Sequence, residues 1–180
     1  MSDAERFEAF VRRYQDLVFA TAVRLLGRPS DAEDVAQTVF LRAFQRFDRL
    51  QDEPAAAAWL RTVTRNACLN HLARYRARWQ FFSELGAGAE AGIDVAGSLA
   101  AAGEAPDATI LRAEAHGRLE DALRRLPDHQ RVPVVLFHFE DMAYQDIARA
   151  LGVSVGKVKT DIHRGREALR RVLRDDHGVT

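Results

Sequence analysis

The sequence has almost no cysteine, and this scarcity excludes two kinds of stabilisation. Cys68 is the only cysteine in 180 residues, so the chain cannot form an intramolecular disulfide. Cys68 and His71 lie three residues apart, but no further ligand pair stands nearby with the spacing of a structural zinc site. We therefore predict neither a metal nor a cofactor.

Long hydrophobic runs are also lacking, as is a basic and then apolar leader. The chain opens with Asp3, Glu5 and Arg6, and its 47% hydrophobic and 29% charged residues are typical of soluble globular proteins. We expect a cytoplasmic protein that does not insert into a membrane.

The net charge is zero, but charges of each sign are segregated along the chain. Residues 59–79 hold five arginines and no acid, residues 83–110 hold five acids and no base, and residues 154–174 hold seven bases against two acids. The sequence therefore has two basic segments separated by an acidic one, and the basic segments are candidates for binding nucleic acid.

The last third of the sequence predicts a helix-turn-helix. Residues 143–170 read as two short helices joined by a tight turn, where Gly152 permits a positive φ. The apolar faces of the two helices are formed by Ile147, Ala148, Leu151, Val158 and Ile162. The outward face of the second helix is basic, which suits the major groove of DNA and its flanking phosphates.

The first half of the sequence predicts three more helices, so the expected fold class is all-α. Apolar residues recur with a period near 3.6 over residues 7–25, and the pattern stops at Gly27. Residues 30–33 (SDAE) read as a capping box that starts a second helix, which runs to about Phe47. A third helix begins after Pro54.

The second and third helices each carry a surface with two explanations. The second has more apolar surface than one neighbour needs, which fits either burial in a three-helix core or a docking surface for another protein. Its mixed edge favours docking; this edge contains Asp34, Gln37, Leu41 and Arg42. The third carries Trp59, Asn66 and Asn70 among its arginines, which fits either single-stranded nucleic acid, stacked on the aromatic ring, or a solvated arginine face.

Residues 81–107 are expected to be an acidic, flexible linker, because they are rich in Gly and Ala and show no sustained periodicity. The linker separates an N-terminal helical domain, residues 1–80, from a C-terminal domain, residues 108–176. In the second domain, Asp107 would cap a helix that ends at Pro127, and a further helix spans about residues 128–139.

Three segments resemble the extracytoplasmic-function (ECF) sigma factors of the sigma-70 family, which are small bacterial transcription initiation factors with two helical domains. Residues 31–44 (DAEDVAQTVFLRAF) resemble the helix that binds core RNA polymerase. Residues 59–72 (WLRTVTRNACLNHL) resemble the segment that melts the promoter and reads its −10 element. Residues 123–131 (LRRLPDHQR), followed by the helix-turn-helix, resemble the −35-binding domain.

The resemblance implies a set of partners and contact residues. The implied partners are core RNA polymerase, promoter DNA and an anti-sigma factor, and no catalytic residue is implied. Polymerase would be contacted by Asp34, Gln37, Phe40, Leu41 and Arg42. The −10 element would be contacted by Trp59, Arg61, Arg65, Asn66, Asn70 and Arg74. The −35 element would be contacted by Ser154, Lys157, Lys159, Thr160, His163, Arg164 and Arg166.

Three residues depart from the family's pattern. Pro133 removes a hydrogen bond toward His129 and predicts a kink in its helix. Lys157 replaces a small hydroxyl residue. Asp161 falls where a cation is common, and there we expect it to repel phosphate and either shift promoter preference or weaken −35 binding.

Two other functions fit the sequence. A stand-alone helix-turn-helix regulator would bind duplex DNA without polymerase, but it would leave the Arg/Asn/Trp helix without a use. A decoy that mimics a sigma factor would sequester an anti-sigma factor and bind little DNA. An enzyme is not expected, because the carboxylates cluster at helix starts and in the linker.

Overall fold

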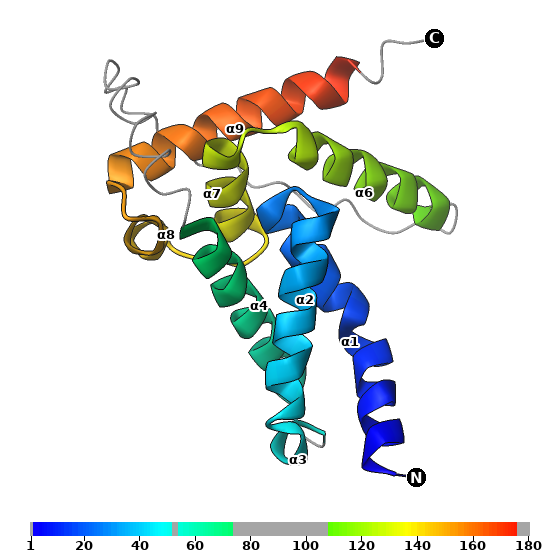
Figure 1. The fold of residues 1–180 in the computed structure, drawn as a ribbon. Coiled ribbons are helices and arrows are strands. Elements are labelled where there is room, and N and C mark those ends of the chain that lie inside the picture. The colour runs from blue at the N-terminus through cyan, green and yellow to red at the C-terminus, as the bar shows by residue number, and fades with distance from the viewer. Residues whose placement is uncertain (1, 52–53, 74–107, 176–180) are drawn as a thin grey trace. The chain divides into compact units, whose positions relative to one another are not determined.

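The computed structural model describes residues 2–51, 54–73 and 108–175, and every regular element within these ranges is helical. The chain divides into two compact units, Met1–Ala77 and Arg78–Thr180. The all-α class is therefore confirmed (Figure 1). The predicted domain boundaries and the linker stay predictions, because residues 74–107 lie outside the described ranges.

In the described part of the N-terminal unit, three long helices pack against one another, and a short helix lies beyond the end of the second (Figure 1). The helices are α1 (Asp3–Leu26), α2 (Pro29–Phe44), α3 (Phe47–Leu50) and α4 (Ala56–Leu72). Their facing sides bury Val18, Leu25, Val39, Leu60 and Cys68. Helix α1 ends as predicted, at Gly27, which takes the left-handed φ of 72°.

The capping box lies on a different helix from the one predicted. Ser2 and Glu5 form it at the start of α1, where the Glu5 amide donates to Ser2 Oγ and Glu5 Oε2 accepts from the Ser2 amide at 2.6 Å. The box predicted at residues 30–33 is wrong. Pro29 needs no amide partner and has a helical φ, so α2 already begins there and Ser30 lies inside the helix.

The second helix also ends earlier than predicted. Arg46 leaves helical geometry with φ −123° and ψ 16°, so residues 47–50 form the separate α3. The break turns Phe47 inward, where its ring packs edge-on against Phe7 and Phe10 with centroids 5.2 and 5.6 Å apart. The chain thus buries the Phe47 ring instead of continuing α2.

The structure describes four helices in the C-terminal unit, within residues 108–175, and α9 contacts the other three. They are α6 (Ala108–Arg125), α7 (Asp128–His138), α8 (Tyr144–Leu151) and α9 (Val155–Asp175). The core of the unit includes Leu123, Val132, Val135, Leu136, Ile147, Val158 and Ile162. Pro127 precedes α7 as its N-cap residue, and the predicted cap Asp107 lies outside the described residues. Pro133 is buried inside α7, which continues past it to His138.

Candidate nucleic-acid interface and docking groove

The predicted helix-turn-helix is formed by α8 and α9. Gly152 ends α8 with a left-handed φ of 68°. Two residues later, Ser154 Oγ accepts a hydrogen bond from the Lys157 amide at 3.1 Å and so caps the start of α9. Val158 and Ile162 are each 1% exposed and fix the inner side of α9 within the unit. The predicted turn and apolar faces are therefore confirmed.

The outward side of α9 presents four of the residues predicted to contact the −35 element. These are Lys159, Thr160, His163 and Arg164, whose spacing places them on one side of the helix. Lys159 and Arg164 are exposed. Lys159 Nζ lies 5.6 Å from the centroid of the Tyr144 ring, which stacks on Phe137 with centroids 4.7 Å apart. The cation is therefore held over an aromatic ring while it remains open to solvent.

The other residues predicted for the −35 contact have partners or positions inside the fold. Ser154 caps α9, and Arg166 is only 8% exposed. Lys157 Nζ donates to Asp161 Oδ2 at 2.7 Å. Asp161 is 5% exposed and does not lie on the outward side of α9. The expectation that its carboxylate repels phosphate is therefore wrong, because it assumed an exposed carboxylate. Helical periodicity places residue 161 at the border of the two faces, and only packing decides its side.

Burial shifts three titratable groups in this unit. It lowers the pKa of His129, with Lys157 and Arg164 acting in the same direction and Asp161 and Asp128 against it. It also lowers the pKa of His138, to which Arg166 contributes. Burial raises the pKa of Asp161, although its hydrogen bond with Lys157 opposes that shift. Both shifts favour the neutral form of the imidazole.

Helix α4 exposes the polar side predicted to contact the −10 element. Arg61, Asn66 and Asn70 are exposed, while Trp59 and Arg65 are partly exposed. The opposite side packs in the core through Leu60, Thr64 and Cys68. Arg74 lies outside the described residues. Because the helix contains no acid, its outward side joins cations, amides and an aromatic ring without a competing carboxylate.

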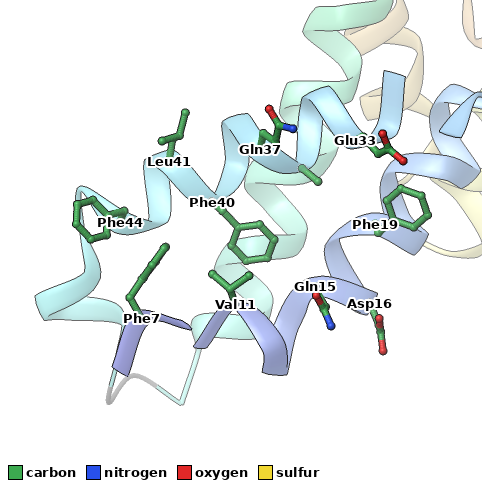
Figure 2. Close-up of a pocket in the computed structure, with 11 residues that line it drawn as sticks. Phe7, Val11, Gln15, Asp16, Phe19, Glu33, Gln37, Phe40, Leu41 and Phe44 are labelled. Carbon is green, nitrogen blue, oxygen red and sulfur yellow. The ribbon is translucent and has the colours of Figure 1, made fainter. Parts of the chain in front are cut away.

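An open groove runs between α1 and α2, with a volume of about 870 Å³. Figure 2 shows the Phe40 ring extending from α2 toward Val11 of α1, whereas Leu41 projects from α2 on another side. Leu41 is 65% exposed and Phe44 is 57% exposed, which is unusual for such large apolar side chains. The surplus apolar surface of α2 is thus divided between the core and an uncovered groove.

Of the residues predicted to bind polymerase, Gln37, Phe40 and Leu41 line this groove, and Asp34 and Arg42 are exposed elsewhere on α2. Sequence reasoning missed the part that α1 contributes. That part comprises Phe7, Val11, Gln15, Asp16 and Phe19. Phe19 offered a signal in the sequence, because it is a large aromatic residue that falls outside the apolar period of its helix. In the structure it is 38% exposed.

Metal-ligating side chains and helix hydropathy bear on two further kinds of site. Within the described ranges, no three His, Cys, Asp or Glu side chains gather closely enough to hold a metal ion. Cys68 is buried, and His71 Nε2 lies 3.7 Å from Asp31 Oδ2, which joins α4 to α2. None of the described helices is both long and apolar enough to cross a membrane.

Comparison with known proteins agrees with this arrangement. Residues 10–78 match the family described as Sigma-70 region 2, and residues 116–169 match Sigma-70, region 4. The chain is 31% identical to the ECF RNA polymerase sigma factor SigW of Bacillus subtilis, over 96% of this chain and 91% of that protein. It is 34% identical to the RNA polymerase sigma-E factor of Streptomyces coelicolor, over 96% and 89%.

A solved structure is similar at lower identity. The sigma factor RpoE, crystallised with the anti-sigma factor NepR from Bartonella quintana, matches with a TM-score of 0.46 and 21% identity, over 93% of this chain and 96% of that one. The family assignment rests on the sequence relatives and on the two matched regions, which include both candidate DNA-contacting helices. The chain belongs to the ECF sigma factors of the sigma-70 family.

Proposed function

We propose that this protein is a promoter-specificity subunit, which binds core RNA polymerase, recognises the −35 and −10 elements of a promoter and assists opening of the duplex. The observation that carries the proposal is that one chain has two exposed polar helix surfaces. The first is the outward side of α9, whose opposite side is apolar and buried, and the second is the Arg/Asn side of α4. The polymerase supplies the chemistry, so the protein itself needs no catalytic residue. The protein acts in the cytoplasm, together with the polymerase.

At the −35 element, α9 enters the major groove. Lys159 and Arg164 offer cationic donors, and Thr160 and His163 lie between them. Each bidentate contact of such donors with a base edge contributes about 1–3 kcal/mol of discrimination. Arg171 lies further along the same helix and is also exposed, which suits a phosphate.

At the −10 element, the outward side of α4 holds the displaced single strand. Trp59 provides a ring for stacking, Asn66 and Asn70 provide amides for base edges, and Arg61 and Arg65 provide charge for the backbone. We include Arg74 in this contact on the basis of the family resemblance.

The groove between α1 and α2, together with Asp34 and Arg42, is the proposed contact with core polymerase. Exposed Leu41 and Phe44 add apolar surface at its edge, which suits a protein interface. An anti-sigma factor that covered this groove would prevent polymerase binding, and we propose such a partner as the regulator of the protein.

Transcription in vitro tests the function. Purified protein plus core polymerase should initiate at specific sites in a genomic promoter library, and absence of initiation from every site would refute the proposal. Replacing Lys159 and Arg164 together by Ala should abolish promoter selection. Arg12→Ala, which removes an exposed, ion-paired arginine from α1, should leave it unchanged.

The same variants separate the alternatives. A stand-alone regulator would bind its duplex with equal affinity in the absence of polymerase. A decoy would keep its biological effect when Lys159 and Arg164 are both replaced, because it needs no DNA contact. The proposed function predicts neither result: binding should be tighter with polymerase, and the biological effect should be lost in the double variant.

A further inference from the structure

Lys157 and Asp161 form an ion pair that is withdrawn from solvent. Their side chains are 15% and 7% exposed, and Lys157 Nζ lies 2.7 Å from Asp161 Oδ2. The neighbouring pair Arg149 and Asp146 is different, with side chains 78% and 53% exposed. A surface pair of that kind contributes little to stability, whereas breaking a buried pair leaves an uncompensated charge in the interior.

Residue 157 is fixed at both of its ends. Its amide donates to Ser154 Oγ in the cap of α9, and its ammonium donates to Asp161 one turn further along the helix. These two bonds tie the turn of the helix-turn-helix to the second turn of α9. Lys159, the exposed cation, lies between the tied positions.

The charged groups around the Asp161 carboxylate come from two helices. On α9 they are Lys157 and Arg164, and on α7 the group is His129, which itself faces Asp128. Burial raises the pKa of Asp161, and Lys157, His129 and Arg164 oppose the shift. Lys157 is the first of them, because it alone both hydrogen-bonds to Asp161 and carries a full charge.

A phosphate contact by Lys157 would require its ammonium to leave Asp161. The carboxylate would then stay buried without its hydrogen-bonded cation. Lys159 and Arg164 are exposed and form no ion pair with a described residue, so they reach phosphate without that loss. The geometry favours a division of labour between neighbouring cations of one helix.

We propose that Lys157 and Asp161 act as a positioning pair, which fixes the first turns of α9 so that Lys159 and Arg164 are aimed at DNA, and that Lys157 itself makes no phosphate contact. This inference rests on the proposed binding of DNA by α9. It assigns one joint role to Lys157 and Asp161, which are two of the three residues that depart from the family's pattern.

Hydrogen exchange of α9 amides in the full chain tests the positioning role. Lys157→Met should make exchange about tenfold faster or more, because Asp161 is left without its partner. Lys157→Arg should keep near-normal protection, since the charge is retained. Lys157→Met combined with Asp161→Asn should recover much of the loss. Equal protection in Lys157→Met and the natural protein would overturn the proposal.

The deficit of Lys157→Met should also depend on pH. Without Lys157, the carboxyl pKa rises further and His129 is protonated more readily, so acidification either neutralises Asp161 or gives it a cation. Compared with the natural protein at the same pH, the variant should therefore lose most protection near pH 7.5 and less near pH 5.5. A deficit that does not change with pH would contradict a role for the buried charge.

Binding to a random-sequence 30-base-pair duplex tests the second part. Lys159→Met should reduce the slope of log affinity against log salt by about 0.9, the value for one lost phosphate contact. Lys157→Arg and the double variant should leave the slope unchanged, and a reduction of about 0.9 in the double variant would refute the division of labour. If Lys159→Met and Arg164→Met both leave the slope unchanged, the proposed DNA contact of α9 fails instead, whatever the exchange data show.

Discussion

The backbones of α9 and α7 approach each other closely at Gly165, and this contact limits what residue 165 can be. A Cβ atom added there would lie 2.7 Å from Val134 Cγ2 and 3.2 Å from the backbone oxygen of Gln130. Carbon atoms pack favourably at about 3.5–4.0 Å. Val134 is β-branched and 2% exposed, and the oxygen belongs to the backbone of α7, so neither atom can withdraw unless the helix moves.

We expect Gly165→Ala to destabilise the C-terminal unit. Overpacking of a filled core costs about 1–3 kcal/mol, and a backbone obstacle favours the upper half of that range. Alanine returns up to about 1 kcal/mol, because it is a better helix former than glycine. The net loss should be about 1–2 kcal/mol, which lowers the ratio of folded to unfolded unit by about 5–30-fold.

Native-state hydrogen exchange of α7 and α9 amides in the full chain measures this loss. Two other glycines serve as controls. A Cβ at Gly117 meets nothing within 4 Å, and one at Gly156 meets only Ser154 Oγ at 4.0 Å. Alanine at either position should raise protection by up to about 1 kcal/mol. If Gly165→Ala raises protection as these controls do, the close approach is not a packing limit and the reasoning is refuted.

Three further predictions concern the groove, the cap and the histidines. Leu41→Asp should weaken core polymerase binding by at least about tenfold, since it puts a charge in place of an exposed apolar side chain of the proposed contact; surface plasmon resonance would measure it, and unchanged affinity would exclude Leu41 from the interface. Ser154→Ala should cost about 1 kcal/mol of exchange protection in α9, and no loss would mean that the hydroxyl does not cap the helix. The lowered pKa values of His129 and His138 mean that their contribution to stability is present above pH 6.5 and is lost as the pH falls below it. Replacing both histidines by Asn should reduce the change in the free energy of unfolding between pH 8 and pH 5.5, measured by chemical denaturation. An unchanged pH dependence would show that other groups cause it.

The sequence predicted most of the helices because their signals are local. The end of α1 follows from Gly27, whose conformation needs no information from elsewhere in the fold. The turn at Gly152 and the apolar side of α9 follow in the same way. The errors occurred where two local signals competed. Ser30 and Glu33 have the composition of a capping box, but the adjacent Pro29 starts the helix first.

The sites were less predictable, because exposure depends on packing between helices. The period of α2 shows that it has excess apolar surface, but only the position of α1 shows that Phe40, Leu41 and Phe44 line a groove in which Leu41 and Phe44 stay exposed. Asp161 is the opposite case, a charged residue that periodicity leaves at a border and that packing buries beside Lys157. A lysine followed by an acid four residues later was the available signal for that pair.

The sorting of charges on α9 bears on how strongly the protein can bind DNA by itself. Of the seven bases between residues 154 and 174, Lys157 is paired with Asp161, Arg166 is buried, Arg170 is paired with Glu167, and Arg174 Nε donates to the Arg170 carbonyl. Lys159, Arg164, Arg171 and Arg174 are exposed without an ion pair to a described residue. Four phosphate contacts give a salt slope of about −3.6, so affinity should fall about 150-fold between 50 and 200 mM salt, compared with thousands-fold for seven contacts. So few contacts give weak binding by α9 alone, and we therefore propose that tight promoter recognition also depends on the α4 surface and on the polymerase.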